Sequence, residues 1–167
     1  MLRIISFYDL AFEDSIEIAA PPERGFAFFE RMDENYTLWH PDHLRFEWRK
    51  GRGLAVGNVF FFEELIAGKL QRKETRITEV VPDRYFAFTM VNPLFRFFLP
   101  HLSFGFTPST GGFVFRAELR LHGIGPLGRR LNRLEFAAVE THMAEEGRNL
   151  KTILEAPEEP GASAVRP

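Results

Sequence analysis

The C-terminal part of the sequence carries a long helical pattern that constrains the rest of the fold. Over residues 129–155, apolar side chains recur at spacings of three, four and seven, which places them on one face of a helix. His142 and Glu146 fall on the same face, four residues apart, so their side chains leave adjacent turns. The apolar members of this stripe are Val139, Met143, Leu150 and Ile153.

A histidine and a carboxylate on the buried face of a helix need partners. Burying an unpaired carboxylate costs much free energy, so the pair requires a hydrogen-bonded polar network or a metal ion. A stripe displaced by one residue would instead leave both side chains at the edge of the buried face. The helical pattern alone does not choose among these three readings.

The composition excludes several classes of protein. A chain of 167 residues is long enough for one domain with a sizeable core. Lysine and arginine are scattered and the net charge is −2, which argues against a nucleic-acid partner. The sequence has no cysteine, so a disulfide, a thiolate metal site and a thiol nucleophile are excluded. No segment is long and apolar enough to span a membrane, and we predict a soluble, cytoplasmic protein.

The periodicity predicts one strand, two short helices, six further strands and one long helix. Pro22 and Glu23 suit the start of the first helix, because proline and acidic residues are favoured in a first turn. Residues 92–100, which contain prolines at both ends, are predicted to form a loop over a pocket mouth. The predicted strands are 14–19, 44–49, 58–66, 70–80, 84–91, 102–106 and 113–121, and the predicted helices are 22–32, 33–39 and 129–155.

Consecutive strands joined by turns, with helices on one side, are typical of an α+β fold. We therefore predict a curved antiparallel sheet of about seven strands wrapped around the long C-terminal helix, with two short helices after the first strand. The predicted domain covers residues 13–155, preceded by an N-terminal extension over 1–12. Residues 156–167 are rich in Pro, Gly, Ala and Glu and are predicted to be a disordered tail.

A second group of ionisable side chains lies at the junction of the short helices with the second strand. Residues 39–43 read Trp-His-Pro-Asp-His, which places two histidines three residues apart on a corner made rigid by proline. Such a pair suits metal ligation or acid–base chemistry. The alternative is a surface junction with solvated histidines. Strand alternation leaves open whether His43 faces inward, and His40 on the corner could do so instead.

The adjacent pair Glu63 and Glu64 supplies a third candidate. Neighbours on a strand point to opposite faces, and the face that carries Phe60, Phe62 and Ile66 includes Glu64. A glutamate between phenylalanines is costly unless it is paired or coordinated. The alternative is a β-bulge that turns both carboxylates outward.

Taken together, these elements could bring two imidazoles and two carboxylates to the inner face of the long helix. That set of nitrogen and oxygen ligands suits zinc or another divalent first-row metal. A serine-nucleophile elbow and a glycine-rich phosphate loop are both absent from the sequence.

The order of elements and several short motifs resemble the helix-grip superfamily, which includes START domains, birch-pollen-allergen-like proteins and polyketide cyclases. The resemblance covers about residues 14–155. It implies the same α+β fold and a cavity for an apolar small molecule. The motifs that carry it are Pro21-Pro22 after the first strand, Ile77-Thr-Glu-Val80 followed by Pro82 and Arg84, and the C-terminal helix.

Within that superfamily, the corner at residues 39–43 and the later His142-x-x-x-Glu146, followed by Asn149, look like the diacetylphloroglucinol hydrolase group. This resemblance implies a zinc enzyme that cleaves the carbon–carbon bond between an acyl group and a phenolic ring with a metal-bound water. The long N-terminal region of those hydrolases is missing here. Carried over, the metal ligands would be His142, Glu146, His43 (or His40) and Glu64 (or, less favoured, Glu63).

We accordingly expect a metal-dependent hydrolase acting on an apolar acyl-aromatic ligand. Two alternatives remain: a non-enzymatic carrier of a lipid-like or polyketide-like ligand, and a metal-free aromatase or cyclase. A homodimer stays open. The nineteen phenylalanines predict a thick core or an aromatic-lined cavity. The predicted ligand-binding residues are Phe60, Phe62, Phe88, Phe115, Val139 and Met143.

Overall fold

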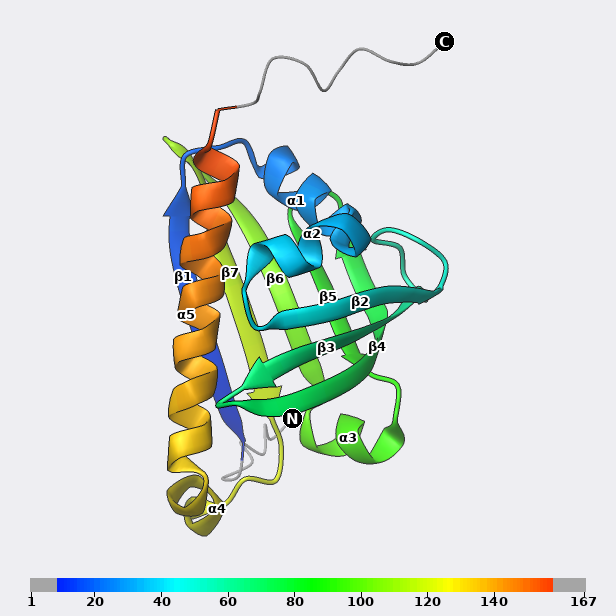
Figure 1. Cartoon of the computed structure of the whole chain (residues 1–167), viewed down its shortest axis with the longest axis vertical. Coiled ribbons are helices and arrows are strands. Elements are labelled where there is room, and N and C mark those ends of the chain that lie inside the picture. The colour runs from blue at the N-terminus through cyan, green and yellow to red at the C-terminus, as the bar shows by residue number, and fades with distance from the viewer. Residues whose placement is uncertain (1–8, 158–167) are drawn as a thin grey trace, which may run out of the picture.

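The computed structural model describes residues 9–157, and its seven strands form one antiparallel sheet in the order β1-β7-β6-β5-β4-β3-β2 (Figure 1). The strands are β1 (Leu10–Ile18), β2 (His43–Lys50), β3 (Val59–Ile66), β4 (Lys69–Val81), β5 (Tyr85–Met90), β6 (His101–Ser109) and β7 (Gly112–Leu121). The helices are α1 (Pro22–Glu30), α2 (Met32–Trp39), α3 (Pro93–Phe98), α4 (Pro126–Leu131) and α5 (Arg133–Glu155).

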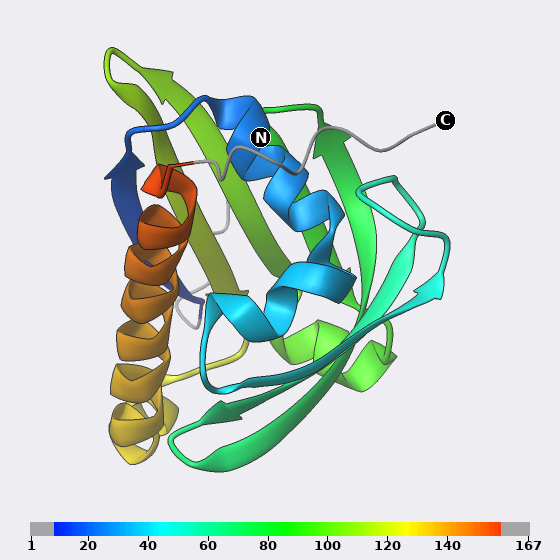
Figure 2. The same cartoon turned by 45° about the horizontal axis from the view of Figure 1, so that its top comes forward.

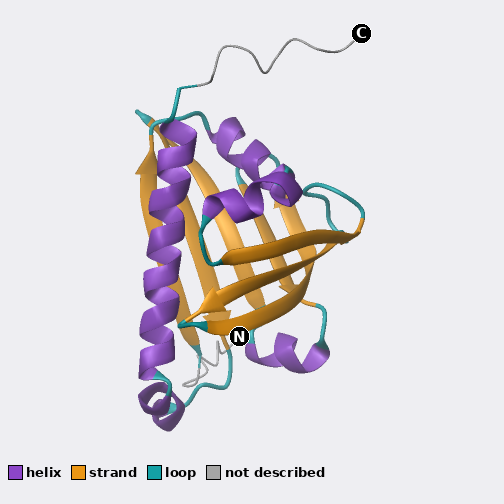
Figure 3. Ribbon diagram, viewed as in Figure 1, coloured by secondary structure: helices purple, strands orange, loops and turns teal. Residues whose placement is uncertain are grey.

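The sheet curves strongly, and α5, α1 and α2 lie on its concave side (Figures 2 and 3). The long helix α5 packs mainly along β1, and α2 packs against β2. This arrangement confirms the predicted α+β helix-grip fold. Within residues 9–157, no helix is long and apolar enough to cross a membrane.

The long C-terminal helix is interrupted near its start, where the sequence predicted one continuous helix from residue 129. The structure has the short helix α4 and then α5, with Asn132 between them at φ −102° and ψ 19°. The side chain of Asn132 donates a hydrogen bond to the carbonyl of Gly128 at 2.9 Å. Asparagine competes for backbone groups in this way and so favours helix ends over helix interiors.

The segment 92–100 is a second difference, because the predicted loop contains α3. The side chain of Asn92 accepts hydrogen bonds from the backbone N–H groups of Leu94 and Phe95 and so caps this helix. Pro93 occupies the first turn, where its missing N–H costs nothing. The prolines therefore bound a short helix rather than exclude one.

The first strand begins earlier than predicted. Residues 10–12, which the sequence placed in an extension, belong to β1 and pair with β7. Phe12 is buried and its ring lies 5.4 Å from that of Phe136 on α5. The rest of the predicted extension and most of the predicted tail lie outside the described residues.

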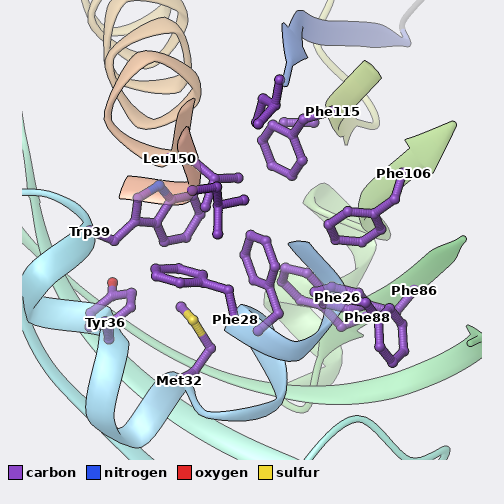
Figure 4. Close-up of a cluster of buried hydrophobic side chains, with 14 of the residues drawn as sticks. Phe26, Phe28, Met32, Tyr36, Trp39, Phe86, Phe88, Phe106, Phe115 and Leu150 are labelled. Carbon is purple, nitrogen blue, oxygen red and sulfur yellow. The ribbon is translucent and has the colours of Figure 1, made fainter. Parts of the chain in front are cut away.

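Aromatic rings fill the space between α1 and the sheet (Figure 4). Phe29 is the centre of this cluster, since it is 1% exposed and meets rings from α2 and from three strands. Offset and edge-to-face contacts of this kind stabilise a core beyond the area that they bury. The rings within 5.0–5.8 Å of that of Phe29 include those of Trp39, Phe86, Phe104, Phe106 and Phe115.

The helix α5 approaches β1 closely at Gly147. A Cβ atom added there would lie 3.0 Å from Asp14 Oδ2 and 3.4 Å from Ile16 Cγ2. Glycine therefore lets the helix axis come nearer to the strand than a larger residue would. Gly147 directly follows Glu146, so this contact also sets the depth of the polar pair predicted on α5.

Candidate metal and ligand site

A bulge in β2 turns His43 toward the inside of the sheet. The register pairs His43 with Glu64 and Arg45 with Glu63, so Leu44 is an extra residue with no partner on β3. An extra residue reverses the alternation of side chains. His43 is consequently 3% exposed, whereas Leu44 is 46% exposed.

Glu64 faces inward and Glu63 faces outward, as strand alternation predicted. The pairing of β3 with β4 is regular from Val59 to Ile66, so the alternative of a bulge in β3 is wrong. Glu64 is 7% exposed. Glu63 instead accepts a hydrogen bond from Arg72 Nε at 2.8 Å on the outer surface.

The helix pair and the strand pair converge. One ligand atom from each of His43, Glu64, His142 and Glu146 lies within 4.8 Å of all the others. His142 Nε2 is 3.9 Å from Glu64 Oε2 and 3.7 Å from Glu146 Oε1. Ligands of a tetrahedral zinc, each about 2.0–2.1 Å from the ion, stand about 3.3 Å apart. The cluster could therefore hold a metal ion after small side-chain adjustments.

The hydrogen bonds of His43 leave one nitrogen pointing at a carboxylate. Its Nδ1 lies 3.1 Å from the backbone carbonyl of Tyr36, so Nδ1 carries the hydrogen and donates it. In the neutral ring Nε2 is then an acceptor, yet it lies 3.0 Å from Glu146 Oε1, which also accepts. Two facing acceptors need a proton or a cation between them. Orientation of a histidine by a backbone carbonyl is also usual for metal ligands.

His142 also has a ring nitrogen that needs a partner. Its Nε2 atom is buried and has no hydrogen-bond partner among the described residues. Burial lowers the pKa of His142 from its ordinary value of 6.5, although Glu146 and Glu64 oppose that shift. The ring therefore favours the neutral form, which is the form that binds metals.

His40 has both ring nitrogens engaged elsewhere. Its Nδ1 accepts a hydrogen bond from the backbone N–H of Asp42 at 3.0 Å. The hydrogen therefore resides on Nε2, which donates to Glu145 Oε2 at 3.3 Å. A compact group of His40, His43 and His142 also exists. The hydrogen bonds nevertheless favour His43 over His40 as the ligand that the sequence left open.

Lys73 and Tyr36 complete the surroundings of Glu64. Burial alone would raise the pKa of this carboxyl, but the ammonium of Lys73 outweighs burial and holds the pKa below its usual range. Lys73 Nζ donates to Glu64 Oε1, and Tyr36 Oη donates to Oε2 at 3.4 Å. The tyrosine ring stacks on His43 with centroids 4.1 Å apart, and burial followed by the nearby carboxylates raises its pKa.

Three of the four cluster residues, Glu64, His142 and Glu146, line a cavity, and His43 lies outside its lining. The centre of a water molecule can occupy about 130 Å³ of it, whereas one water needs about 10–15 Å³ on that measure. The cavity thus has room for a small organic ligand. Of the predicted ligand-binding residues, those that line it are Phe60, Phe62, Phe88, Val139 and Met143.

Phe115 does not line this cavity. Its ring stacks on Phe29 at 5.8 Å and on Phe104 at 5.5 Å, behind the wall, and it is 1% exposed. Both of these neighbours, Phe29 and Phe104, do line the cavity. The remaining aromatic lining residues are Phe29, Tyr36, Trp39, Phe46, Trp48, Phe86 and Phe104.

Tyr36, Trp39 and Lys73 were absent from the predicted site. Trp39 Nε1 donates to the backbone carbonyl of Glu146 at 2.9 Å and so ties α2 to α5 beside the cluster. The spacing of Tyr36 and Trp39, three apart on one helical face, could have indicated burial. Lys73 could have been found by counting back in steps of two from the buried Ile77.

Comparisons with known proteins agree with this architecture. One solved structure with the same fold is the di-domain aromatase/cyclase BexL of the BE-7585A biosynthetic pathway, at a TM-score of 0.72 and 14% identity. The alignment covers 92% of this chain but 52% of BexL, so the chain spans about half the length of that protein. No curated protein matches the sequence.

Two further structures match over most of their own length. The Zhui aromatase/cyclase of Streptomyces sp. R1128 has a TM-score of 0.70 at 12% identity, with 89% of this chain and 94% of Zhui covered. The major latex-like protein 151 of Panax ginseng has a TM-score of 0.70 at 11% identity, with 89% and 99% covered. At these identities the likeness shows the fold.

The predicted membership of the helix-grip superfamily is confirmed, whereas these comparisons do not reach the diacetylphloroglucinol hydrolase group. Residues 9–155 match the family described as polyketide cyclase/dehydrase and lipid transport. Because this match spans most of the sequence, the chain belongs to the polyketide cyclase/dehydrase and lipid transport family.

Proposed function

We propose that the protein binds an apolar, polyketide-like aromatic molecule in its cavity and hydrolyses the bond between an acyl group and the aromatic ring. The reaction would use a divalent metal ion, for which zinc is the first candidate. Family membership and fold support a more general role, that of a ligand-binding or cyclase protein. The observation that supports the metal is the buried His142 Nε2, which has no hydrogen-bond partner, beside His43 Nε2 and Glu146 Oε1, which need a proton or a cation between them.

In this proposal the ion is held by His43, Glu64, His142 and Glu146. Bound zinc would act as a Lewis acid toward a carbonyl and would lower the pKa of water. Lys73 occupies Glu64 Oε1, which leaves Oε2 turned toward the two histidines. The carbonyl of Tyr36 fixes the ring of His43, so the site is oriented before any ligand enters.

The cavity suits the substrate class by its chemistry. Its walls are predominantly apolar and include ten Phe, Tyr and Trp side chains, while Glu64, His142 and Glu146 supply polar groups. An aromatic ring would pack against Phe60 and Phe62 with its acyl group toward the cluster. Hydrolysis would place the hydroxyl of water on the acyl carbon and a proton on the ring carbon, so that a carboxylic acid and the free arene leave.

The test combines metal content with activity. We expect about one zinc per chain in protein purified without chelator, and deacylation of C-acylated phenols that a chelator abolishes and added zinc restores. The variants His142→Ala and Glu146→Gln should lose both properties. Glu145→Gln, which alters the neighbouring carboxylate that accepts from His40, is the matched control and should retain them. A protein that binds the phenols but contains no metal and releases no acid would overturn the proposal.

A second candidate is a metal-free aromatase or cyclase. It is favoured by the fold shared with the aromatase/cyclases BexL and Zhui. Here a histidine of the same cluster would move protons as a general acid or base. Cyclisation of a linear polyketide that is unaffected by chelator would favour this candidate. A carrier would bind the same molecules and release them unchanged.

A further inference from the structure

Two short helices at one end of the molecule expose much apolar surface. Figures 1 and 3 show α3 and α4 at the same end, and neither helix contains a buried residue. Of the twelve large apolar side chains exposed among the described residues, seven lie on α3, on α4 or in the first turn of α5. We call these seven the apolar end face: Leu94, Phe95, Phe97, Phe98, Leu127, Leu131 and Leu134.

The two helices are held in place by contacts near the end of β7. The backbone N–H of His122 donates to the carbonyl of Phe98 at 2.9 Å, and the ring of Phe97 lies edge-on to that of His122. On the other side, Arg129 of α4 donates to the backbone carbonyl of Asp9 at 2.8 Å. The apolar side chains are therefore presented from an anchored surface.

The segments that contain α3 and α4 carry positively charged side chains and no negatively charged ones. Residues 92–100 and 123–134 contain four arginines and neither aspartate nor glutamate, although the whole chain has a net charge of −2. The two carboxylates that flank these segments already have partners, since Asp9 pairs with His122 and Glu135 with Lys69. Within residues 9–157, none of the four forms an ion pair. The arginines are Arg96, Arg129, Arg130 and Arg133.

The polar uncharged side chains of these segments already form hydrogen bonds within the protein. Asn92 caps α3, and Asn132 bonds to Gly128 within α4. What remains for a partner is apolar and guanidinium surface. A specific protein interface carries about one hydrogen bond per 100–200 Å² and so needs acceptors as well as donors. A lipid surface needs only apolar side chains and cations, because its phosphates supply the acceptors.

We propose that the apolar end face docks on the surface of an anionic lipid membrane. Its phenylalanines and leucines enter the boundary between headgroups and acyl chains, and its arginines bind the lipid phosphates. The binding is peripheral, because no described helix could span the bilayer. The cavity reaches toward this end: its half-buried lining residues Leu102 and Leu119 lie next to the connections to α3 and α4. An apolar ligand could thus pass between bilayer and cavity without crossing bulk water.

Flotation with lipid vesicles tests the proposal. The full-length protein is mixed with vesicles of phosphatidylcholine alone, or of equal parts phosphatidylcholine and phosphatidylglycerol. We expect binding to the second kind only, and weaker binding as salt increases. Arg130→Glu with Arg133→Glu should lower the partition coefficient at least about twentyfold, at about fivefold or more for each arginine. Phe95→Ser with Leu131→Ser should lower it about tenfold or more.

Matched controls carry the same changes elsewhere. Arg148→Glu reverses an exposed charge on the other half of α5, and Leu38→Ser removes a leucine that is 72% exposed on α2. Both should bind like the wild type. Equal binding of all variants, or no preference for anionic lipid, would overturn the proposal. So would a dimer in sedimentation equilibrium that dissociates on Phe95→Ser with Leu131→Ser, since a second copy would then cover the face. The assay needs neither metal nor substrate, so its outcome is separate from that of the proposed hydrolysis.

Discussion

His43 and Glu64 stand directly opposite each other across β2 and β3, although their neighbours in sequence are out of step by one residue. The extra residue Leu44 causes this offset and itself points to solvent. Without the bulge, regular alternation would turn either His43 or the Phe46 face outward. A single unpaired residue at the edge of the sheet thus places an imidazole beside a buried carboxylate.

The two corner histidines should differ in their effect on metal binding. His43→Gln removes a nitrogen that points into the cluster, so zinc affinity should fall by more than about 100-fold. This loss exceeds the one usual for a residue that only holds a metal ligand in place. His40→Gln disturbs the hydrogen bonds to Asp42 and Glu145 and the ring contact with His142 but leaves the four proposed ligands in place, so it should cost less than about tenfold. Competition with a fluorescent zinc chelator measures both. The reverse order would assign the ligand role to His40.

Lys73→Met should make metal binding more sensitive to acid. Lys73 is the main group that holds the pKa of Glu64 down against burial, so its removal raises that pKa. Protons then compete with the metal at higher pH, and the pH midpoint of zinc binding should move upward. Lys69→Met is the control, since Lys69 pairs with Glu135 on the surface. An unchanged midpoint would show that Lys73 does not act through Glu64.

The stability of metal-free protein should fall as the pH drops below 6.5. In the folded state, burial lowers the pKa of His142 below its ordinary value of 6.5. Below pH 6.5 the unfolded chain therefore binds a proton more readily than the folded chain does. This contribution is complete above 6.5 and is lost as the pH falls toward the folded pKa. Urea unfolding in the presence of chelator, between pH 7 and about pH 5, measures the slope. His142→Asn should flatten it, and a slope unchanged by this substitution would assign the effect to other groups.

Phe29→Ala should destabilise the fold by about 3–5 kcal/mol, because it removes the ring on which the aromatic cluster converges and leaves a cavity. Phe95→Ala is the matched control. Its ring is 55% exposed, so its effect should stay within about 0.5 kcal/mol. Chemical denaturation monitored by circular dichroism gives both values. A small effect at Phe29 would mean that neighbouring rings close the gap.

Much of the fold could be predicted because its signals are local. Alternation identified the strands, and Pro22 marked the first helix at the residue where α1 begins. Errors arose where one side chain redirects the backbone. Asn132 ends α4, and Asn92 caps α3, and neither effect is visible in hydrophobic periodicity. The domain boundaries, the cytoplasmic location, the homodimer and the lack of a nucleic-acid partner stay predictions.

The candidate site was less accessible to sequence than the fold. The spacing of His142 and Glu146 put both on one helical face, and alternation put Glu64 inside. The choice between His40 and His43 depends on a bulge and on two hydrogen bonds to the backbone, neither of which has a sequence period. Their roles as ligands stay a prediction.

The contact at Gly147 influences how far α5 lies from β1, and this distance does not depend on the side chains of the four proposed ligands. A Cβ atom there would lie 3.0 Å from Asp14 Oδ2 and 3.4 Å from Ile16 Cγ2, so either these side chains or α5, with His142 and Glu146, would have to shift by a few tenths of an ångström. Zinc binds nitrogen and oxygen at about 2.0–2.2 Å, whereas calcium binds oxygen at about 2.3–2.6 Å. At the proposed metal site, the clearance between helix and strand would therefore influence which ionic radius fits. Evolution or design could change which ion fits by altering a residue that touches neither the ion nor its ligands.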